Sequence, residues 1–400
     1  MSQSTAAERA QHVEQLAREQ HPHVVAWRRQ MHHNPELSFQ EVQTAEFLAN
    51  ALQAIDGLTL ERPTATSLVA VLRGGKPGAT LAIRADIDAL PIQDAKTCDY
   101  ASGNPGAMHA CGHDGHAAML LGAAHILAGM RDQVPGEVRF FFQHAEELHP
   151  GGAQEMVDAG VMEGVDRVIS AHVMSLLDVG HVSVIDGPTL ASSDRFTLTV
   201  TGRGGHASMP NMSVDPLWVA AQIVTNLQAV VSRNTNPLDP VVVSVTRFHA
   251  GEAFNVIPDQ AEIGGSVRCF SEEVRNQVPE LIERIANGVA QAHGATVELN
   301  YVRGYSSVVN DPVIAGAMRD VVTDCIASAE STPMPPLSGS EDFSAFLKKA
   351  PGAYAFIGAR NEARGIVHPH HHPHFDFDEE ALLHGVQLFV NAPFAINTLG

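Results

Sequence analysis

Short apolar runs alternate with amphipathic stretches in the first part of the chain and recur near its C-terminal end. Runs rich in Val, Ile, Ala and Phe predict strands at residues 68–72, 80–83, 137–142, 167–170 and 353–357. Helical periodicity predicts helices at residues 44–55, 117–130 and 153–159. Strands that alternate with helices are typical of a sheet covered by helices on both faces. We therefore expect an α/β domain with a mixed sheet.

The pattern changes in the middle of the chain. Strand-like runs occur at residues 194–201, 241–248, 260–270 and 296–302, and amphipathic helices at 216–231 and 272–293. This β-α-β-β-α-β order matches the ferredoxin-like plan, a four-stranded antiparallel sheet with two helices on one face. We predict an inserted α+β domain at residues 188–303. Residues 1–187 and 304–400 then form the other domain, and two domains suit a chain of 400 residues.

Charge and cysteine usage narrow the class of protein. The formal net charge of −20 argues against nucleic acid or an anionic membrane as a partner, because both attract cationic surfaces. No apolar run is long enough to span a bilayer, and the polar, helix-prone residues 1–18 lack the apolar centre of a signal peptide. The four cysteines form no C-x-x-C pair. We therefore expect reduced thiols and a cytoplasmic protein.

Residues 108–116 (MHACGHDGH) hold a thiol and three imidazoles close together. Sulfur and nitrogen donors suit a transition metal better than Mg²⁺ or Ca²⁺, which prefer oxygen. Cys111 and His113 are two residues apart, so on a helix they would point in different directions. They share an ion only if this stretch is looped or extended before the helix begins. The alternative is a buried thiol beside polar residues that cap the helix.

Other metal-capable residues follow predicted strands. These are Asp86 and Asp88, then Glu146 and Glu147, then His172, and finally the histidine cluster at residues 368–374. Ligands of α/β sheets collect beyond the carboxyl ends of the strands, so we expect these groups to share one edge. The alternative is a set of unrelated loop residues.

The donors expected at this edge are Cys111, His113, Glu147, His172 and one histidine of the late cluster. Five ligands exceed the four of a closed structural zinc site. A thiolate can bridge two ions, so the set favours a pair of metals about 3.5–4 Å apart with open positions.

Glu146 and Glu147 are adjacent, which makes them poor candidates for two equivalent ligands. We interpret Glu147 as a ligand and Glu146 as a general base that faces water, against the alternative of a solvated loop. Asp86 is interpreted as a support that orients His113 through its other ring nitrogen, against the alternative of a turn cap.

The predicted inserted domain carries three further polar candidates. His206 lies in a glycine-rich loop that lacks the Lys-Ser/Thr of a phosphate-binding P-loop, and it suits an oxyanion donor. Arg268 suits a bidentate grip on a substrate carboxylate, and Asn255 is a second candidate for substrate contact. Ordinary structural roles remain open for all three.

The motifs taken together resemble a known family. They are residues 84–91 (RADIDALP), 108–116, 142–147 (FQHAEE), 204–207 (GGHA), 255–259 (NVIPD) and 341–343 (EDF). In this order they are similar to the di-metal aminoacylase/carboxypeptidase amidohydrolases, in particular to the hippurate hydrolase and indole-acetyl-amino-acid hydrolase branch. The resemblance runs from about residue 32 to the late histidine cluster.

The resemblance implies a metal-binding catalytic domain with a smaller dimerisation or lid domain, and a homodimer, with a tetramer left open. It implies two divalent transition-metal ions per subunit, zinc or manganese, with cobalt or nickel as alternatives. The implied ligands are Cys111 as a bridge, His113, Glu147, His172 and His371.

The late pattern His-x-Pro-x-Phe selects His371, and its neighbours His370 and His372 stay open as alternatives. His144 stands where the family usually has Pro, which implies an extra imidazole near the metals.

The other roles follow the same resemblance. Glu146 is the implied general base, with Asp86 in support. His206 is expected to stabilise the oxyanion in the partner subunit's site, while Asn255 and Arg268 meet the substrate. We expect hydrolysis of an N-acyl amino acid to a carboxylate and a free amino acid. The alternatives are a metallocarboxypeptidase or dipeptidase on short peptides and, more distantly, a non-catalytic metal- or amino-acid-binding protein.

Overall fold

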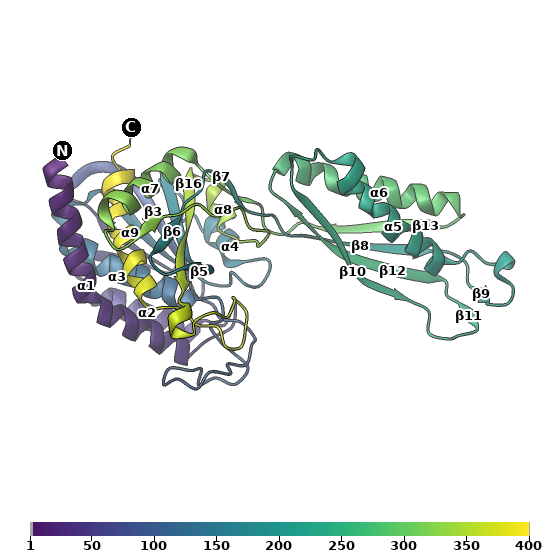
Figure 1. Ribbon diagram of the computed structural model, residues 1–400, viewed down its shortest axis with the longest axis horizontal. Coiled ribbons are helices and arrows are strands. Elements are labelled where there is room, and N and C mark those ends of the chain that lie inside the picture. Colours follow the sequence, from purple (N-terminus) through teal and green to yellow (C-terminus); the bar gives the residue numbers. More distant parts are fainter. Residues whose placement is uncertain (1–2, 400) are drawn as a thin grey trace. The chain divides into compact units, whose positions relative to one another are not determined.

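The structure is a computed structural model that describes residues 3–399 and divides into two compact units (Figure 1). Unit 1 takes in Met1–Gly187, Val309–Pro335 and Ala345–Gly400, and unit 2 takes in Pro188–Val308 and Pro336–Ser344. The expected insertion at 188–303 lies within unit 2, which continues to Val308 and adds one later segment. Residues 1, 2 and 400 of the expected first domain lie outside the described residues.

Unit 1 is built on a single large sheet. Its strands are β1 (Leu58–Glu61), β2 (Leu68–Arg73), β3 (Lys76–Asp86), β4 (Pro135–Gln143), β5 (Arg167–Asp178), β6 (His181–Ser183), β15 (Glu330–Ser331) and β16 (Gly352–Arg360). Their order is β1-β2-β4-β3-β5-β16-β6-β15. The central strands β4, β3, β5 and β16 are parallel, whereas β2 pairs antiparallel with β4. The expected mixed α/β sheet is confirmed.

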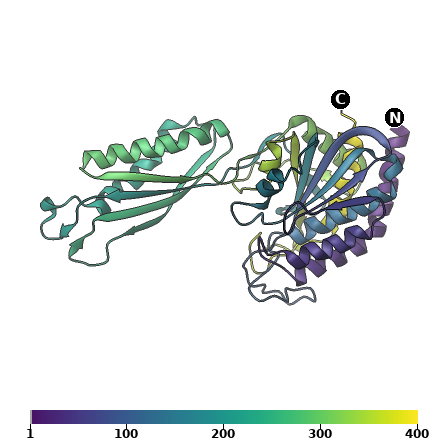
Figure 2. The ribbon, with the colours of Figure 1, turned by 180° about the vertical axis from the view of Figure 1, so that it is seen from behind.

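Helices cover this sheet. They are α1 (Gln3–His33), α2 (Val42–Gln53), α3 (His113–Gly129), α4 (Gly152–Asp158), α7 (Pro312–Cys325), α8 (Ser344–Leu347) and α9 (Glu380–Ile396), with short 3-10 turns at Arg131–Gln133 and Glu362–Arg364. Figures 1 and 2 show α1, α3 and α9 on the same side of the sheet. None of the described helices combines the length and apolar character needed to cross a membrane.

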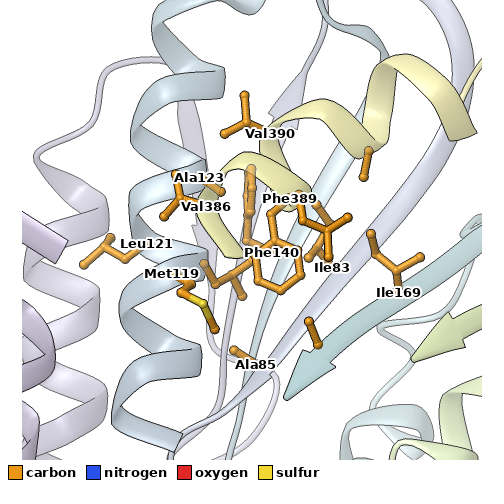
Figure 3. Close-up of a cluster of buried hydrophobic side chains, with 14 of the residues drawn as sticks. Ile83, Ala85, Met119, Leu121, Ala123, Phe140, Ile169, Val386, Phe389 and Val390 are labelled. Carbon is orange, nitrogen blue, oxygen red and sulfur yellow. The ribbon is translucent and has the colours of Figure 1, made fainter. Parts of the chain in front are cut away.

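Successive side chains of β4 point to opposite faces of the sheet, and both faces are buried in the core of unit 1. Phe140 and Phe142 point to one face, where Phe140 lies among the side chains of α3 and α9 (Figure 3). Phe141 points to the other face and packs its ring 5.7 Å from that of Phe346 in α8. Because both faces bury large side chains, the strand reads as a continuous apolar run rather than an alternating one.

His172 lies inside a strand, not after one as we expected. β5 continues to Asp178, and His172 pairs across to Phe356 of β16. The last pair between β3 and β5 is Arg84 with Ser170, so β5 continues beyond the part that pairs with β3. The side chain of His172 therefore still reaches the carboxyl edge of the sheet, because β16 extends the pairing that β3 no longer provides.

Unit 2 has the expected ferredoxin-like order. Its main elements are β8 (Asp194–Thr201), α5 (Pro216–Asn234), β10 (Val241–Ala250), β12 (Gln260–Cys269), α6 (Glu272–Ala292) and β13 (Thr296–Val302). The four strands form an antiparallel sheet in the order β10-β12-β8-β13, and α5 and α6 pack on one face. Smaller elements of unit 2 are β9 (Gly205–His206), β11 (Val256–Ile257) and a 3-10 turn at Pro210–Met212. The strands β7 (Gly187–Leu190) and β14 (Val308–Asn310) each include residues of both units.

A buried ion pair joins the start of β8 to α6. Asp194, the first residue of β8, accepts hydrogen bonds at 2.7 and 2.9 Å from Arg275 of α6. It also accepts from the Tyr301 hydroxyl and the Gly304 amide. Burial opposes the ionisation of Asp194, but these hydrogen bonds outweigh burial and lower its pKa.

We expect Asp194→Ala to lower the free energy of unfolding of unit 2 by about 3–5 kcal/mol, because it removes the buried partner of the Arg275 charge and leaves only the half-exposed Glu272 to pair with it. In the wild type this stabilisation is complete above about pH 4 and is lost as the pH falls further, since a lowered carboxyl pKa favours the folded state only when the group is ionised. Urea unfolding at several pH values measures both effects. Glu262→Ala is the control: its pair with Arg247 is about half exposed, so its loss should cost at most about 1 kcal/mol. Equal losses from the two variants would contradict the prediction.

Candidate metal centre and active site

The chain turns sharply between Cys111 and His113. Gly112 has a φ of 95°, and a Cβ there would lie 2.4 Å from Val173, so the turn requires glycine. His113 is the first residue of α3, and Cys111 precedes the helix. This meets the condition set by the spacing, because the thiol and the imidazole are not on one helix and can face the same point.

The predicted donors of unit 1 converge. Three groups have ligand atoms that all lie within 4.8 Å of one another: Cys111 with His113 and His172, Cys111 with Glu147 and His371, and His113 with Glu146 and Glu147. The Cys111 sulfur lies 3.4 Å from Nε2 of His172, and Nε2 of His371 lies 3.2 Å from Oε1 of Glu147. Cys111 belongs to two of the groups, which is the arrangement that a thiolate shared by two ions requires.

Two imidazoles are held with their Nε2 atoms directed into the cluster. His172 donates from Nδ1 to the Val173 carbonyl at 2.6 Å, and His113 donates from Nδ1 to Asp88 at 3.1 Å. Nε2 of His113 is buried and has no hydrogen-bond partner within residues 3–399, and it lies 3.9 Å from Oε1 of Glu147. Metal-binding histidines usually donate their other ring N–H in this way, so both rings are oriented for a cation.

We expected the second ring nitrogen of His113 to donate to Asp86, but it donates to Asp88 instead. Asp88 also accepts from the Ser38 hydroxyl at 2.6 Å and from the Glu147 amide at 3.0 Å, so it positions two donors at once. Asp86 accepts from His116 at 2.6 Å and from Arg84 at 2.7 Å, and lies 3.7 Å from the inner nitrogen of His113. Residues 86 and 88 share one face of an extended chain, so the sequence pattern could not rank them.

The electrostatics of the cluster fit a divalent cation. Burial and the nearby Glu147 and Glu146 carboxylates raise the pKa of the Cys111 thiol well above its usual range. Burial lowers the pKa of His113, but Asp86 and Asp88 outweigh burial and raise it to about 10. Acidic donors crowded in a buried site repel one another unless a cation joins them. The S, N and O donors, the unpaired Nε2 of His113 and this charge pattern together fit two transition-metal ions.

A strained turn presents the two glutamates. Ala145, directly before Glu146, has a φ of 49°, a region that non-glycine residues rarely adopt. Its amide donates at 2.8 Å to Glu41, which is fully buried and also accepts from the Thr66 hydroxyl. Glu41 therefore holds the turn that carries Glu146 and Glu147. Sequence reasoning missed Glu41, because an acidic residue before a helix is ordinarily a capping or solvated group.

The histidine neighbours of His371 have other contacts. His370 accepts at 3.1 Å from the Ser175 amide, and His372 accepts from the His374 amide and stacks on another ring. Among the described residues, His371 is the one of the three whose ring nitrogen lies with Cys111 and Glu147.

His144 also differs from expectation. It bonds Glu155 at 3.0 Å and packs its ring against Phe39. Its imidazole belongs to none of the donor groups named above.

The three candidates outside unit 1 all lie in unit 2. His206 is exposed on β9 and pairs with Val256 of β11, next to Asn255, whose carbonyl accepts from the Ala207 amide. Arg268 is half-buried on β12, and its Nη1 has no hydrogen-bond partner in the described part of the chain. Burial lowers the pKa of Arg268, because no anion compensates its charge fully.

His206 and Arg268 are far apart within unit 2. β12 runs from Gln260, beside the β9–β11 ribbon, to Arg268 near its other end. At about 3.4 Å per residue, this part of the strand spans roughly 27 Å. One small substrate cannot contact both residues of the same unit 2.

A mixed α/β sheet whose carboxyl edge gathers a thiol, imidazoles and carboxylates is the architecture of a metallohydrolase. The chain belongs to the peptidase family M20/M25/M40, whose family model matches residues 82–393. It is 53% identical over 298 residues to the N-acyl-L-amino acid amidohydrolase of Geobacillus stearothermophilus, covering 74% of this chain and 80% of the relative. The protein is therefore an enzyme of the amidohydrolase type, as its motifs predicted.

Two further comparisons bear on the chemistry. The chain is 39% identical over 363 residues to thermostable carboxypeptidase 2 of Saccharolobus solfataricus, covering 90% of this chain and 91% of the relative. It is similar to the solved structure of a dinuclear metal-binding peptidase of the M20 family from Bacillus subtilis. The TM-score is 0.85 at 36% identity, and the match covers 95% of this chain and 99% of that one.

Proposed function

We propose that the enzyme hydrolyses the amide bond of N-acyl amino acids, hippurate-like or other acyl conjugates, to a carboxylate and a free amino acid. The observation that carries the proposal is the donor cluster around Cys111 with the buried Glu146 carboxylate beside it. The similarity to an N-acyl-L-amino acid amidohydrolase supports the substrate class.

The proposed cofactors are two divalent transition-metal ions per subunit, zinc or manganese, with cobalt or nickel as alternatives. The residues that would hold them are Cys111, His113, Glu147, His172 and His371. Such ions supply Lewis acidity, which lowers the pKa of water and polarises an amide carbonyl.

The remaining steps belong to side chains of the protein. Glu146 accepts a proton from the attacking water and then delivers it to the leaving amide nitrogen. His206 donates a hydrogen bond to the oxygen on which negative charge develops, and Asn255 orients the substrate. Asp88 and Asp86 hold the imidazoles of His113 and His116 in place.

We infer that the enzyme is a homodimer, with a tetramer built from such dimers as an alternative. His206 and Arg268 of one chain cannot meet the same small substrate, so His206 serves the site of the partner subunit. The four free thiols suit the cytoplasm, where we expect the enzyme to act.

Arg268 is the proposed anchor for the free α-carboxylate, because its guanidinium is partly buried and Nη1 lacks a partner. We expect Arg268→Met to lower kcat/KM on an N-acyl amino acid by about 10- to 100-fold, mainly through KM, since charge-assisted hydrogen bonds contribute about 1.5–3 kcal/mol. The same substrate capped as a carboxamide lacks the carboxylate and should lose much less. Steady-state kinetics on both substrates, with Arg195→Met as a matched surface control, measure the difference. Equal losses on both substrates would remove Arg268 from this role.

A substrate panel tests the proposed reaction. Benzoyl-, acetyl- and indole-acetyl-amino acids and dipeptides are assayed on enzyme reloaded with each metal. We expect kcat/KM on the best acyl-amino acid to exceed that on every dipeptide by at least tenfold. The reverse order would favour the second candidate function, a carboxypeptidase or dipeptidase, which the similarity to a thermostable carboxypeptidase suggests.

A further inference from the structure

Arg28 of α1 is buried at a junction of three segments of unit 1. Its side chain is 0% exposed, and its guanidinium makes an ion pair with each of three carboxylates. Nε donates to Asp114 at 2.8 Å, Nη2 to Asp376 at 2.7 Å and Nη1 to Glu379 at 3.2 Å. The faces of the same group pack on the rings of Tyr100 and Phe377. No part of this guanidinium is left for solvent.

The carboxylates belong to segments that carry the proposed metal ligands. Asp114 directly follows His113 at the start of α3, and Asp376 lies in the loop that contains His371. The backbone amide of His371 also donates to the Ala110 carbonyl at 2.8 Å, so the two segments touch near the donors. Arg28 therefore links the Cys111–His113 turn to the His371 loop through Asp114 and Asp376, which are not among the proposed metal ligands.

A second set of hydrogen bonds from α1 links the same two segments. His32 lies one helical turn after Arg28 and bonds the same oxygen of Asp114 at 2.8 Å. Lys96 donates to the other ring nitrogen of His32 and to the Phe375 carbonyl, both at 2.8 Å. Asp114 and the loop after His371 are thus linked twice through α1, and neither link includes a metal donor.

We propose that Arg28 is a positioning residue for the metal centre: it fixes the Cys111–His113 turn against the His371 loop and so sets the affinity for the metal ions. The inference rests on the ligand set of the proposed function. Without Arg28, three buried or half-buried carboxylates face one another across the junction. The two ligand-bearing segments then separate. The free energy needed to bring them together is taken from the free energy of metal binding, so the affinity for the metal ions falls.

The chain offers a matched control. Arg29 is the next residue of α1 and donates to Glu379 at 2.6 and 2.8 Å, but about half of its side chain is exposed. Arg29→Met removes an arginine, a positive charge and an ion pair from the same helix, while the hydrogen bonds from Arg28 to Asp114 and Asp376 remain.

The test measures metal affinity of the full-length protein. Apoprotein of the wild type, Arg28→Met, Arg28→Lys and Arg29→Met is titrated with Zn²⁺ and with Mn²⁺ against a chromogenic chelator. We expect Kd for at least one ion to rise by about 10- to 100-fold in Arg28→Met, as is common when partners of metal ligands are removed. Arg28→Lys should weaken binding less, and Arg29→Met should stay within about threefold of the wild type.

Thermal unfolding of the apoproteins separates positioning from general stability. A lower Tm with unchanged Kd in Arg28→Met, or equal weakening in Arg29→Met, would overturn the proposal. If Arg28→Met does not fold, Asp376→Asn removes the negative charge from the same link with little change of shape, and it must also raise Kd. Because the titration uses no substrate, its outcome is independent of which amide the enzyme hydrolyses.

Discussion

We expect Glu146→Gln to lower kcat on N-acyl amino acids by about 10²- to 10⁴-fold, the range that a general base contributes, and to leave the metal content unchanged. The amide is nearly isosteric with the carboxylate but cannot accept the proton of water. Glu146 is buried, and one of its carboxylate oxygens lies within 4.8 Å of a ring nitrogen of His113 and a carboxylate oxygen of Glu147, so a change at this position acts on the reaction and not on a solvated loop. Turnover at saturating substrate and elemental analysis of the same preparation measure the two quantities.

The adjacent residue is the control for this experiment. Glu147→Gln weakens a proposed metal ligand, so the loss of activity should accompany a loss of bound metal and should be partly restored by excess metal. Excess metal should not restore Glu146→Gln. If Glu146→Gln keeps more than a tenth of the wild-type kcat, or if its metal content falls with its activity, Glu146 is not the base.

Removing the metal ions with a chelator is expected to abolish hydrolysis, and adding Zn²⁺, Mn²⁺, Co²⁺ or Ni²⁺ should restore it to different extents. Reloading should release protons. Burial and the nearby carboxylates raise the pKa of Cys111, and carboxylates raise that of His113 to about 10, so both groups carry protons near pH 7.5 until a cation binds. Ligands must be deprotonated to bind metal, and metal affinity therefore rises with pH over this range.

Calorimetric titration in two buffers of different ionisation enthalpy counts the protons released. Cys111→Ala should release about one proton fewer than the wild type, lose at least one of the two ions, and lose activity by about 10³-fold or more, because it removes the donor that two groups share. Cys98→Ala, at a thiol outside those groups, is the matched control and should behave as the wild type. Full metal content and activity in Cys111→Ala would contradict the proposed bridge.

The periodicity of the chain predicted most of the elements. The five strands predicted for unit 1 lie inside the observed β2, β3, β4, β5 and β16, and the β-α-β-β-α-β order of unit 2 is confirmed. Local pattern suffices there, because the strands of unit 1 are runs of buried apolar residues and each helix of unit 2 buries one stripe. It did not suffice for the length of β5, since pairing with β16 and not local sequence carries that strand past His172.

The candidate residues divide in the same way. Donor chemistry selected Cys111, His113 and Glu147, because thiol, imidazole and carboxylate groups clustered after strands have few other uses in one sheet. The sequence could not choose Asp88 over Asp86 as the partner of His113, and it gave no sign of Glu41. These choices depend on which oxygen lies within about 3 Å of a nitrogen, and the backbone turns of distant segments decide that distance.

The sequence by itself determined the kinds of donor, their order along the chain and the two sets of elements that carry them, because residue type and periodicity are local properties. Only the tertiary structure decided which donors meet, which carboxylate supports which imidazole, and that Arg28 lies between the turn of Cys111 and the loop of His371. Those contacts join residues that are 25 to 348 positions apart. They exist only because parallel strands bring their carboxyl ends to one edge and α1 packs against α3 and α9 behind it.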